Sequence, residues 1–188
     1  MDNNNEEFFL FKKDDLDEWF VNNPAKYESY KEMWRIALED YLGTFDDAND
    51  LPKDITYFLF LYNENDLIGM LSFSLINNYQ PYQRFGINKF IYVEDIVVNK
   101  NYRKRGYCSK ILKELFRIKK ENDYILTVDE INEPAIKCYE KNGFQELDMA
   151  NGVLTMIKPS DNQKGGYFNK YKKYKTKYLK LKNIIYYT

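Results

Sequence analysis

A run of cations beside one glycine is the part of this sequence best suited to binding an anion. The run Arg103-Lys104-Arg105 comes directly before Gly106, and the stretch from Cys108 to Lys120 has the apolar spacing of an amphipathic helix. Amides at a helix N-terminus have no partner within the helix and attract anions, and glycine lets a ligand come close to the backbone. The turn therefore predicts a phosphate-binding site, although a basic turn before a helix also occurs as a plain solvated loop.

Two adjacent acids, Glu94 and Asp95, are the second chemical feature. They interrupt an apolar and β-branched run, Lys89 to Val98, which is the strongest strand candidate in the chain. Adjacent side chains on a strand point to opposite faces, so at least one carboxyl group needs a specific reason for burial, or a site. The chain has no His, so the usual zinc and Ser-His-Asp chemistries lose an essential member and acid–base work falls to Glu, Asp, Tyr, Lys, Cys or water. No metal is expected.

The elements that would position these residues alternate between strands and helices. The chain is predicted to begin with a strand at 8–12, after which Asp14 or Asp15 can cap a helical region that continues to about residue 42. A β-hairpin, a loop, and then a strand, helix, strand, helix and strand follow, with predicted ranges 55–62, 67–76, 77–88, 89–98, 108–120, 124–128, 132–141 and 152–158. This order predicts a mixed α/β sheet.

The basic turn and a second motif downstream together resemble a known family. Arg103, Gly106 and Cys108 fit its motif of Arg or Gln, two residues, Gly, one residue, and Gly or Ala, with Cys a departure at the last position. The words Asn132-Glu133-Pro134-Ala135 and Tyr139-Glu140-Lys141-Asn142-Gly143-Phe144 fit its second motif. The chain therefore resembles the GNAT superfamily of acetyl-CoA-dependent N-acetyltransferases. The resemblance implies a mixed, mostly antiparallel central sheet flanked by helices.

The resemblance, which covers about residues 55–158, also implies where the cosubstrate acetyl-CoA would bind. In the family a bulge interrupts the central strand, and its backbone contacts the pantetheine arm; by position that segment is Ile96 to Val98 here. The pyrophosphate would lie on the amides of Lys104 to Ser109. Tyr139 stands where the family places a tyrosine near the cofactor sulfur, so it would protonate the departing thiolate as general acid. The implied cofactor-binding residues are Ile96, Val97, Val98, Arg103, Lys104, Arg105, Gly106, Tyr107, Cys108, Ser109, Asn132, Ala135 and Tyr139.

The acceptor amine must lose a proton, because a lysine-like amine with a pKa near ~10.4 is mostly protonated at neutral pH. Glu94 is the preferred base or acceptor-binding group, with Asp95 as its partner or as a structural hydrogen bonder. Other acids close to the motifs, Asp129, Glu130 and Glu133, are explained equally well by solvation. The family transfers acetyl directly to the amine, so Cys108 and Cys138 are expected to be structural and not nucleophiles.

The words Tyr92-Val93-Glu94-Asp95 and Asn132-Glu133-Pro134-Ala135-Ile136 resemble in particular the spermidine/spermine N-acetyltransferase branch. Paired acids and an acidic body would suit a cationic amine, so the hypothesis is acetylation of a polyamine or another small amine. Two alternatives stay open. One is a protein lysine or N-terminal amine as acceptor, and the other is an acyl-CoA-binding interaction module.

The composition is that of one compact domain with a short appendage. The chain has 188 residues, of which 44% are apolar and 18% aromatic, and its mean hydropathy is −0.67. No apolar run approaches the ~20 residues that span a bilayer, and the start MDNNNEE lacks the parts of a secretory signal. A cytoplasmic protein is expected, and two cysteines are too few for a disulfide scaffold.

Charge divides the chain near Pro159. Residues 1–158 have a formal net charge of −8 and residues 159–188 one of +7, so an N-acetyltransferase domain is predicted at 1–158 and a basic Lys/Tyr-rich tail, possibly helical, at 159–188. The tail is similar to C-terminal segments of giant DNA virus proteins, including those of mimivirus relatives, which implies a viral protein in a host cytoplasm or packaged in a particle. It would contact nucleic acid, an anionic surface or a protein partner, or would be a solvated appendage. The family also makes a homodimer an option.

Overall fold

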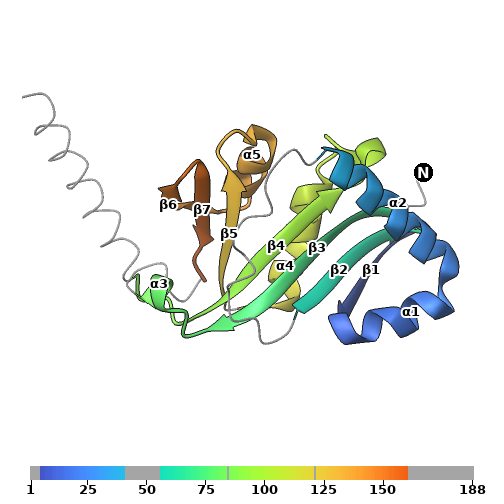
Figure 1. Ribbon diagram of the computed structural model, residues 1–188, viewed down its shortest axis with the longest axis horizontal. Coiled ribbons are helices and arrows are strands. Elements are labelled where there is room, and N and C mark those ends of the chain that lie inside the picture. Colours follow the sequence, from blue (N-terminus) through green and yellow to red (C-terminus); the bar gives the residue numbers. More distant parts are fainter. Residues whose placement is uncertain (1–4, 41–55, 84, 121, 161–188) are drawn as a thin grey trace, which may run out of the picture.

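A computed structural model describes residues 5–40, 56–83, 85–120 and 122–160, without the side chains of 34–40. Its centre is a seven-stranded sheet in the order β1-β2-β3-β4-β5-β7-β6 (Figure 1). The strands are β1 (Glu6–Lys12), β2 (Thr56–Asn63), β3 (Asp66–Asn77), β4 (Lys89–Val98), β5 (Asp123–Asp129), β6 (Gln145–Ala150) and β7 (Val153–Lys158). Every neighbouring pair is antiparallel except β4 and β5, which are parallel. This confirms a mixed, mostly antiparallel sheet.

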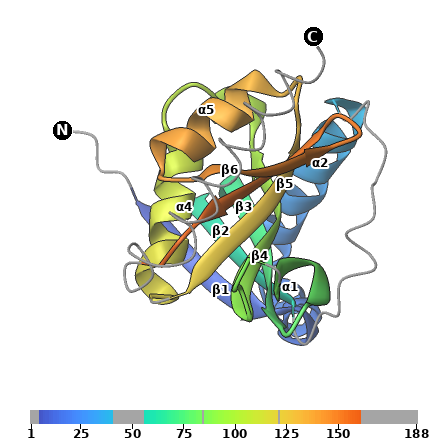
Figure 2. The same cartoon turned by 90° about the vertical axis from the view of Figure 1, so that its left-hand side faces the viewer.

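Helices cover both faces of the sheet (Figure 2). On one face lie α1 (Leu16–Asn22) and α2 (Pro24–Asp40), and on the other lie α4 (Tyr107–Ile118) and α5 (Glu133–Lys141). The apolar stripe of α4 is fully buried against the sheet, with Ile111, Leu112 and Leu115 each 0% exposed. Two sets of apolar side chains therefore sandwich the sheet, one toward α4 and α5 and the other toward α1 and α2.

The predicted elements occur in the predicted order, and four local details differ. A short helix, α3 (Gln80–Gln83), lies within the segment predicted as a loop, and the β6 strand was not predicted. Asp15 occupies the N-cap position of α1 but its side chain makes no capping hydrogen bond. Short 3-10 turns, η1 (Lys13–Asp15) and η3 (Lys100–Tyr102), follow β1 and β4. The predicted basic tail, apart from its first two residues, lies outside the described residues.

The ordered body continues slightly past the last strand. Ser160 is 5% exposed, and its backbone amide donates a 2.7 Å hydrogen bond to Oδ1 of the buried Asp123. This contact fixes the chain two residues beyond Lys158. Within the part of the chain that the structure describes, no helix is both long enough and apolar enough to cross a membrane.

Candidate active site

The parallel strands β4 and β5 pair for only part of their length. Their register joins Phe90–Val93 of β4 to Asp123–Leu126 of β5, although β4 continues to Val98 and β5 to Asp129. Figure 1 shows the two strands diverging beyond that point. The backbone of β4 from residue 94 onward is thus without a strand neighbour on the β5 side among the described residues. A ligand can hydrogen-bond to backbone that has left its partner strand.

A β-bulge lies at the point of divergence. In the pairing with β3, Ser72 faces Asp95 and Phe73 faces Val93, so Glu94 is an extra residue with no counterpart. An extra residue shifts the alternation of the strand by one. The expectation that the two acids point to opposite faces is therefore wrong, because both carboxyl groups reach serines that lie on one face of β3.

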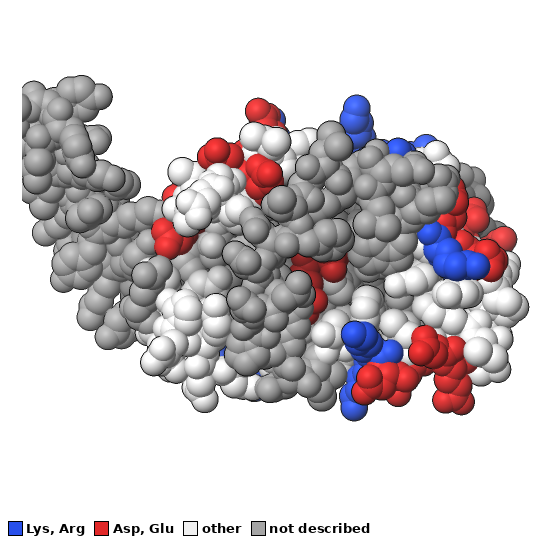
Figure 3. Space-filling view, in the orientation of Figure 1, with Lys and Arg blue, Asp and Glu red and all other residues white. Residues whose placement is uncertain are grey.

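The packing of β4 on either side of the bulge agrees with this shift. Val93 and Ile96 both pack in the cluster under α4, although they are three residues apart, and Val97 packs on the opposite side, against the α1 and α2 cluster. The face that carries both acids is consequently the α1 and α2 face. Acidic side chains reach the surface near the middle of this view, where Figure 1 places β4 (Figure 3).

Two buried serines on β3 hold the carboxylates. Ser72 Oγ donates to Asp95 Oδ2 at 2.7 Å, and Ser74 Oγ donates to Glu94 Oε1. Both serines are buried, while Glu94 is half-buried and Asp95 is exposed. The serines of β3 thus orient the two carboxylates on the sheet side, and both carboxylates remain accessible to solvent. These serines were not among the site residues predicted from the sequence. Their Ser-Phe-Ser spacing within an apolar strand could have indicated them, since residues i and i+2 of a strand share a face and buried hydroxyls need hydrogen-bond partners.

Tyr139 is buried on α5, and its hydroxyl lacks a protein partner. The residue is 9% exposed and its ring packs 5.9 Å from that of Phe144. No group that the structure describes accepts a hydrogen bond from this hydroxyl, which is unusual for a buried phenol. Burial raises the pKa of Tyr139 to about 12, and the negative charge of Asp95 adds to the shift. The phenol stays protonated at neutral pH and can donate to a ligand.

The basic turn leads directly into α4, as the sequence predicts. Gly106 is the N-cap of the helix with φ 86°, and Lys104 also has a left-handed backbone, with φ 62°. A β-carbon on Gly106 would meet nothing within 4 Å, so the surface above it is open. Arg103 Nε donates to the carbonyl of Val98 at 3.1 Å and so ties the turn to the end of β4. The amides that open α4 therefore lie close to the strand segment that has left its partner.

The start of α5 is fixed by its own cap. Asn132 is the N-cap, and its Oδ1 accepts a 3.3 Å hydrogen bond from the amide of Ala135. Pro134 stands in the first turn, where a missing amide hydrogen costs nothing. The side-chain oxygen of Asn132 is thus engaged within the helix, and the predicted contact of Asn132 and Ala135 with a cofactor arm stays a prediction.

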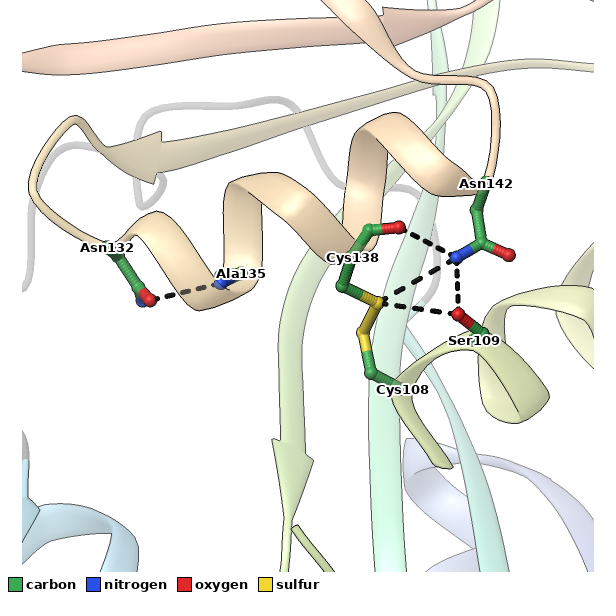
Figure 4. The surroundings of a disulfide bond; sticks show 6 residues. All are labelled: Cys108, Ser109, Asn132, Ala135, Cys138 and Asn142. Carbon is green, nitrogen blue, oxygen red and sulfur yellow. Dashed lines mark hydrogen bonds between the residues drawn. A yellow bond between two sulfur atoms is a disulfide. The ribbon is translucent and has the colours of Figure 1, made fainter. Parts of the chain in front are cut away.

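Cys108 and Cys138 form a disulfide, which was not predicted from the sequence. Cys108 is the second residue of α4 and Cys138 directly precedes Tyr139 on α5 (Figure 4). Their separation of 30 residues gave no signal, because only the packing of α4 beside α5 brings them together. The expectation that both cysteines are structural agrees with this bond. Cys108, which replaces the Gly or Ala at the last position of the first motif, is thus one of the two bonded cysteines.

The structure thus brings together the bulge of β4 at the point where β4 and β5 part, the basic N-terminus of α4 and the buried phenol of Tyr139. The model of the acetyltransferase (GNAT) family matches residues 13–144. The chain belongs to this family of acetyl-CoA-dependent N-acetyltransferases.

Two proteins of Bacillus subtilis are similar to this chain. The probable spermine N(1)-acetyltransferase of subspecies natto is 30% identical over 142 residues, covering 69% of this chain and 82% of that protein. The spermine/spermidine N(1)-acetyltransferase of strain 168 is 29% identical over the same length, with the same coverage.

Solved structures share the fold at low sequence identity. Arabidopsis thaliana NAA60, in complex with a bisubstrate analogue, has a TM-score of 0.54 at 15% identity and covers 81% of this chain and 96% of its own. The PaiA N-acetyltransferase of Thermoplasma acidophilum, in complex with coenzyme A, has a TM-score of 0.51 at 17% identity and covers 82% and 98%. They establish the architecture around the site.

Proposed function

We propose that this protein transfers acetyl from acetyl-CoA to a primary amine of a polyamine or another small cationic amine. The observation that carries the proposal is the bulge in β4. It brings Glu94 and Asp95 to one face, each held by a buried serine, at the point where β4 and β5 part. Two adjacent carboxylates attract an acceptor with two or more positive charges more strongly than they attract an acceptor with one. The two Bacillus relatives named for spermine and spermidine support the same acceptor class.

The cosubstrate is proposed to lie across the residues that the structure brings to this edge of the sheet. The pyrophosphate would lie on the amides of Lys104 to Ser109, and the pantetheine arm along the side of Ile96 to Val98 that faces away from β3, where β5 no longer pairs with β4. The open surface at Gly106 and the run of cations before it fit a phosphate group. Residues 1–158 would then form the catalytic domain, and the basic tail would have a separate role.

Acetyl-CoA supplies a thioester, and the amine nitrogen attacks its carbonyl carbon, so that a C–N bond forms while the C–S bond breaks. Glu94 would accept the proton that the ammonium group loses, directly or through water, and Asp95 would hold the charge of the acceptor. Tyr139 would donate a hydrogen bond to the sulfur as negative charge develops there. The pKa of Tyr139, about 12, lies well above that of a thiol, ~8.5, so the phenol keeps its proton and would stabilise the thiolate of CoA chiefly by this hydrogen bond. The proton that the amine nitrogen releases after the attack then converts the thiolate of CoA to the thiol.

The experiment is an acceptor panel with the full chain, in which acetylated product is detected by mass. The panel contains spermidine, spermine, short diamines, free lysine, amino sugars and basic peptides, all with acetyl-CoA. Turnover on polyamines and diamines at low acceptor concentration supports the proposal. Turnover confined to peptides would assign a protein lysine or N-terminal amine as acceptor, and binding of acetyl-CoA with no turnover would leave an acyl-CoA-binding module.

Matched variants test the residues in the same panel. Glu94→Gln and Asp95→Asn each keep the size of the side chain and remove its charge, and we expect the KM for a polyamine to rise about tenfold or more. Glu114→Gln is the control, because Glu114 pairs with Arg117 of its own helix, α4, and is assigned to no proposed ligand. If Glu94→Gln left the amine kinetics untouched, Glu94 would be neither base nor acceptor-binding group.

A further inference from the structure

The disulfide between Cys108 and Cys138 joins the two helices that flank the proposed cofactor site. Cys108 lies two residues after the Gly106 N-cap, in the first turn of α4, and Cys138 lies one residue before Tyr139 on α5. One covalent bond therefore links the proposed pyrophosphate-binding amides to the helix that holds the phenol (Figure 4).

The hydrogen bonds between α4 and α5 gather around the same sulfur atoms. Asn142 Nδ2 donates to Ser109 Oγ at 2.8 Å and to the carbonyl of Cys138 at 2.7 Å. Ser109 Oγ and Asn142 Nδ2 lie 3.9 Å and 3.8 Å from Cys138 Sγ. Figure 4 shows these contacts clustered on one side of α5. Cleavage of the disulfide therefore alters the centre of the junction between the two helices.

The pair is open to thiol chemistry. Both cysteines are half-buried, and the chain has no third cysteine that could compete for either of them. Thiol–disulfide exchange requires access of a thiolate to one of the two sulfur atoms, and a half-buried bond on a helix surface offers that access.

We propose that Cys108 and Cys138 form a reversible thiol–disulfide site that controls acetyl-CoA binding, with the disulfide form binding the cosubstrate more tightly than the dithiol form. This inference rests on the proposed position of the pyrophosphate at the start of α4. Reduction consumes a dithiol: its thiolate attacks one sulfur and the other sulfur leaves as a thiolate. The second thiol of the reductant then breaks the mixed disulfide. Two protein thiols and one oxidised dithiol result.

Two physical effects favour weaker binding after reduction. The helix N-terminus and the preceding cations stabilise a thiolate on Cys108, which places negative charge beside the amides that would hold the pyrophosphate. The neutral disulfide has no such charge. Reduction also removes the covalent link between α4 and α5, which leaves the Asn142 hydrogen bonds and the apolar packing to hold the two helices together. Both effects lower the affinity for acetyl-CoA.

The test measures acetyl-CoA binding by calorimetry on the full chain, once as the disulfide and once after reduction by dithiothreitol. Alkylation and mass measurement count the free thiols in each sample. We expect no free thiols before reduction, two after it, and a Kd for acetyl-CoA that rises about tenfold. A Kd that is unchanged within twofold, or that falls, overturns the proposal. Two free thiols after air or glutathione-disulfide oxidation also overturn it.

Single variants separate the two effects. Cys138→Ser leaves a thiol on Cys108, whereas Cys108→Ser leaves the start of α4 without one, and both lose the link. We expect both to bind more weakly than the disulfide form and Cys138→Ser to bind more weakly than Cys108→Ser, with no response of either to dithiothreitol. Thermal unfolding checks that each variant is folded. Equal wild-type affinity in both variants contradicts the inference.

The same data keep the inference distinct from the proposed function. Failure of acetyl-CoA to bind in either redox state would remove the proposed cofactor site itself. Binding with equal affinity in both states would leave that site intact and remove only the control by the disulfide.

Discussion

Tyr139 and Tyr124 lie in the same hydrophobic cluster but differ in what their hydroxyl groups do. Tyr124 Oη donates to the carbonyl of Lys119 at 2.5 Å, whereas no described group accepts a hydrogen bond from Tyr139. A buried phenol without a protein partner gains little stability from its hydroxyl. Tyr124 can therefore serve as the control residue in a test of the role proposed for Tyr139.

We expect Tyr139→Phe to lower kcat about 100-fold, because the developing thiolate loses its hydrogen-bond donor, with little loss of thermal stability. Tyr124→Phe should show the reverse pattern, with a loss of about 1 kcal/mol in the free energy of unfolding and an almost unchanged kcat. Steady-state kinetics and thermal unfolding of both variants check this. A Tyr139→Phe enzyme with wild-type kcat would remove the phenol from the mechanism.

The two serines of β3 hold the carboxylates that are proposed to bind the acceptor amine. We expect Ser72→Ala and Ser74→Ala to raise the KM for the amine about tenfold, because each removes the donor that orients a carboxylate, and to leave the Kd for acetyl-CoA unchanged. Thr56→Val is the control: its hydroxyl contacts Ser74 Oγ at 3.2 Å but contacts neither carboxylate. Equal changes in amine KM and acetyl-CoA Kd would indicate a general loss of packing and not a positioning role.

At the scale of elements, β4 shows how far the sequence could predict the site. Its range, 89–98, agrees with the prediction, because a long β-branched run bounded by turn residues is a strong local signal. The family resemblance implied a bulge in this strand at Ile96 to Val98, whereas the structure has it at Glu94, because its position depends on the register with β3. The disulfide and the burial of the two serines likewise depend on how elements pack. Local motifs therefore identified the residues, and their common face came only from the fold.

The start of α4 gives a prediction with a matched control. Gly106 and Gly152 both have a left-handed backbone, with φ of 86° and 80°, and an alanine β-carbon would meet no atom closer than 3.6 Å at either position. Gly106→Ala and Gly152→Ala should each cost about 1 kcal/mol of stability, because the backbone conformation is unfavourable for alanine. Only Gly106→Ala should weaken acetyl-CoA binding, as measured by calorimetry. Equal affinities in the two variants would place the pyrophosphate elsewhere.

For the whole molecule, the separation of charge predicts how the reaction responds to salt. The net charge of −8 on residues 1–158 attracts a polycation, and this attraction is screened as ionic strength rises. The KM for spermine should therefore rise with salt more steeply than that for a monoamine of similar length. Removal of residues 161–188 keeps the Ser160 contact and should preserve the difference. Identical salt dependence for both amines would contradict recognition by charge.

The buried tyrosines predict the stability of the molecule at alkaline pH. Burial raises the pKa of Tyr82 and of Tyr139 to about 12, and it also raises the pKa of Tyr62, Tyr92 and Tyr124. In the unfolded chain these phenols ionise near their ordinary pKa of about 10. Below that pH both states keep the protons, and these groups give no pH dependence. Above it the unfolded state releases protons that the folded state retains, so stability falls as the pH rises from 10 toward 12.

Denaturant unfolding at pH 8, 9, 10 and 11, with tyrosinate absorbance as a second signal, measures this dependence. We expect a constant free energy of unfolding from pH 8 to 9, a decline between 10 and 11, and a jump in tyrosinate absorbance that coincides with unfolding. Tyr139→Phe should reduce the slope of the decline above pH 10, because one group that binds a proton differently in the two states is gone. If all 18 tyrosines ionised near pH 10 while the protein was still folded, the five phenols named above would be open to solvent, and the buried, protonated state of Tyr139 on which the thiolate contact depends would be wrong.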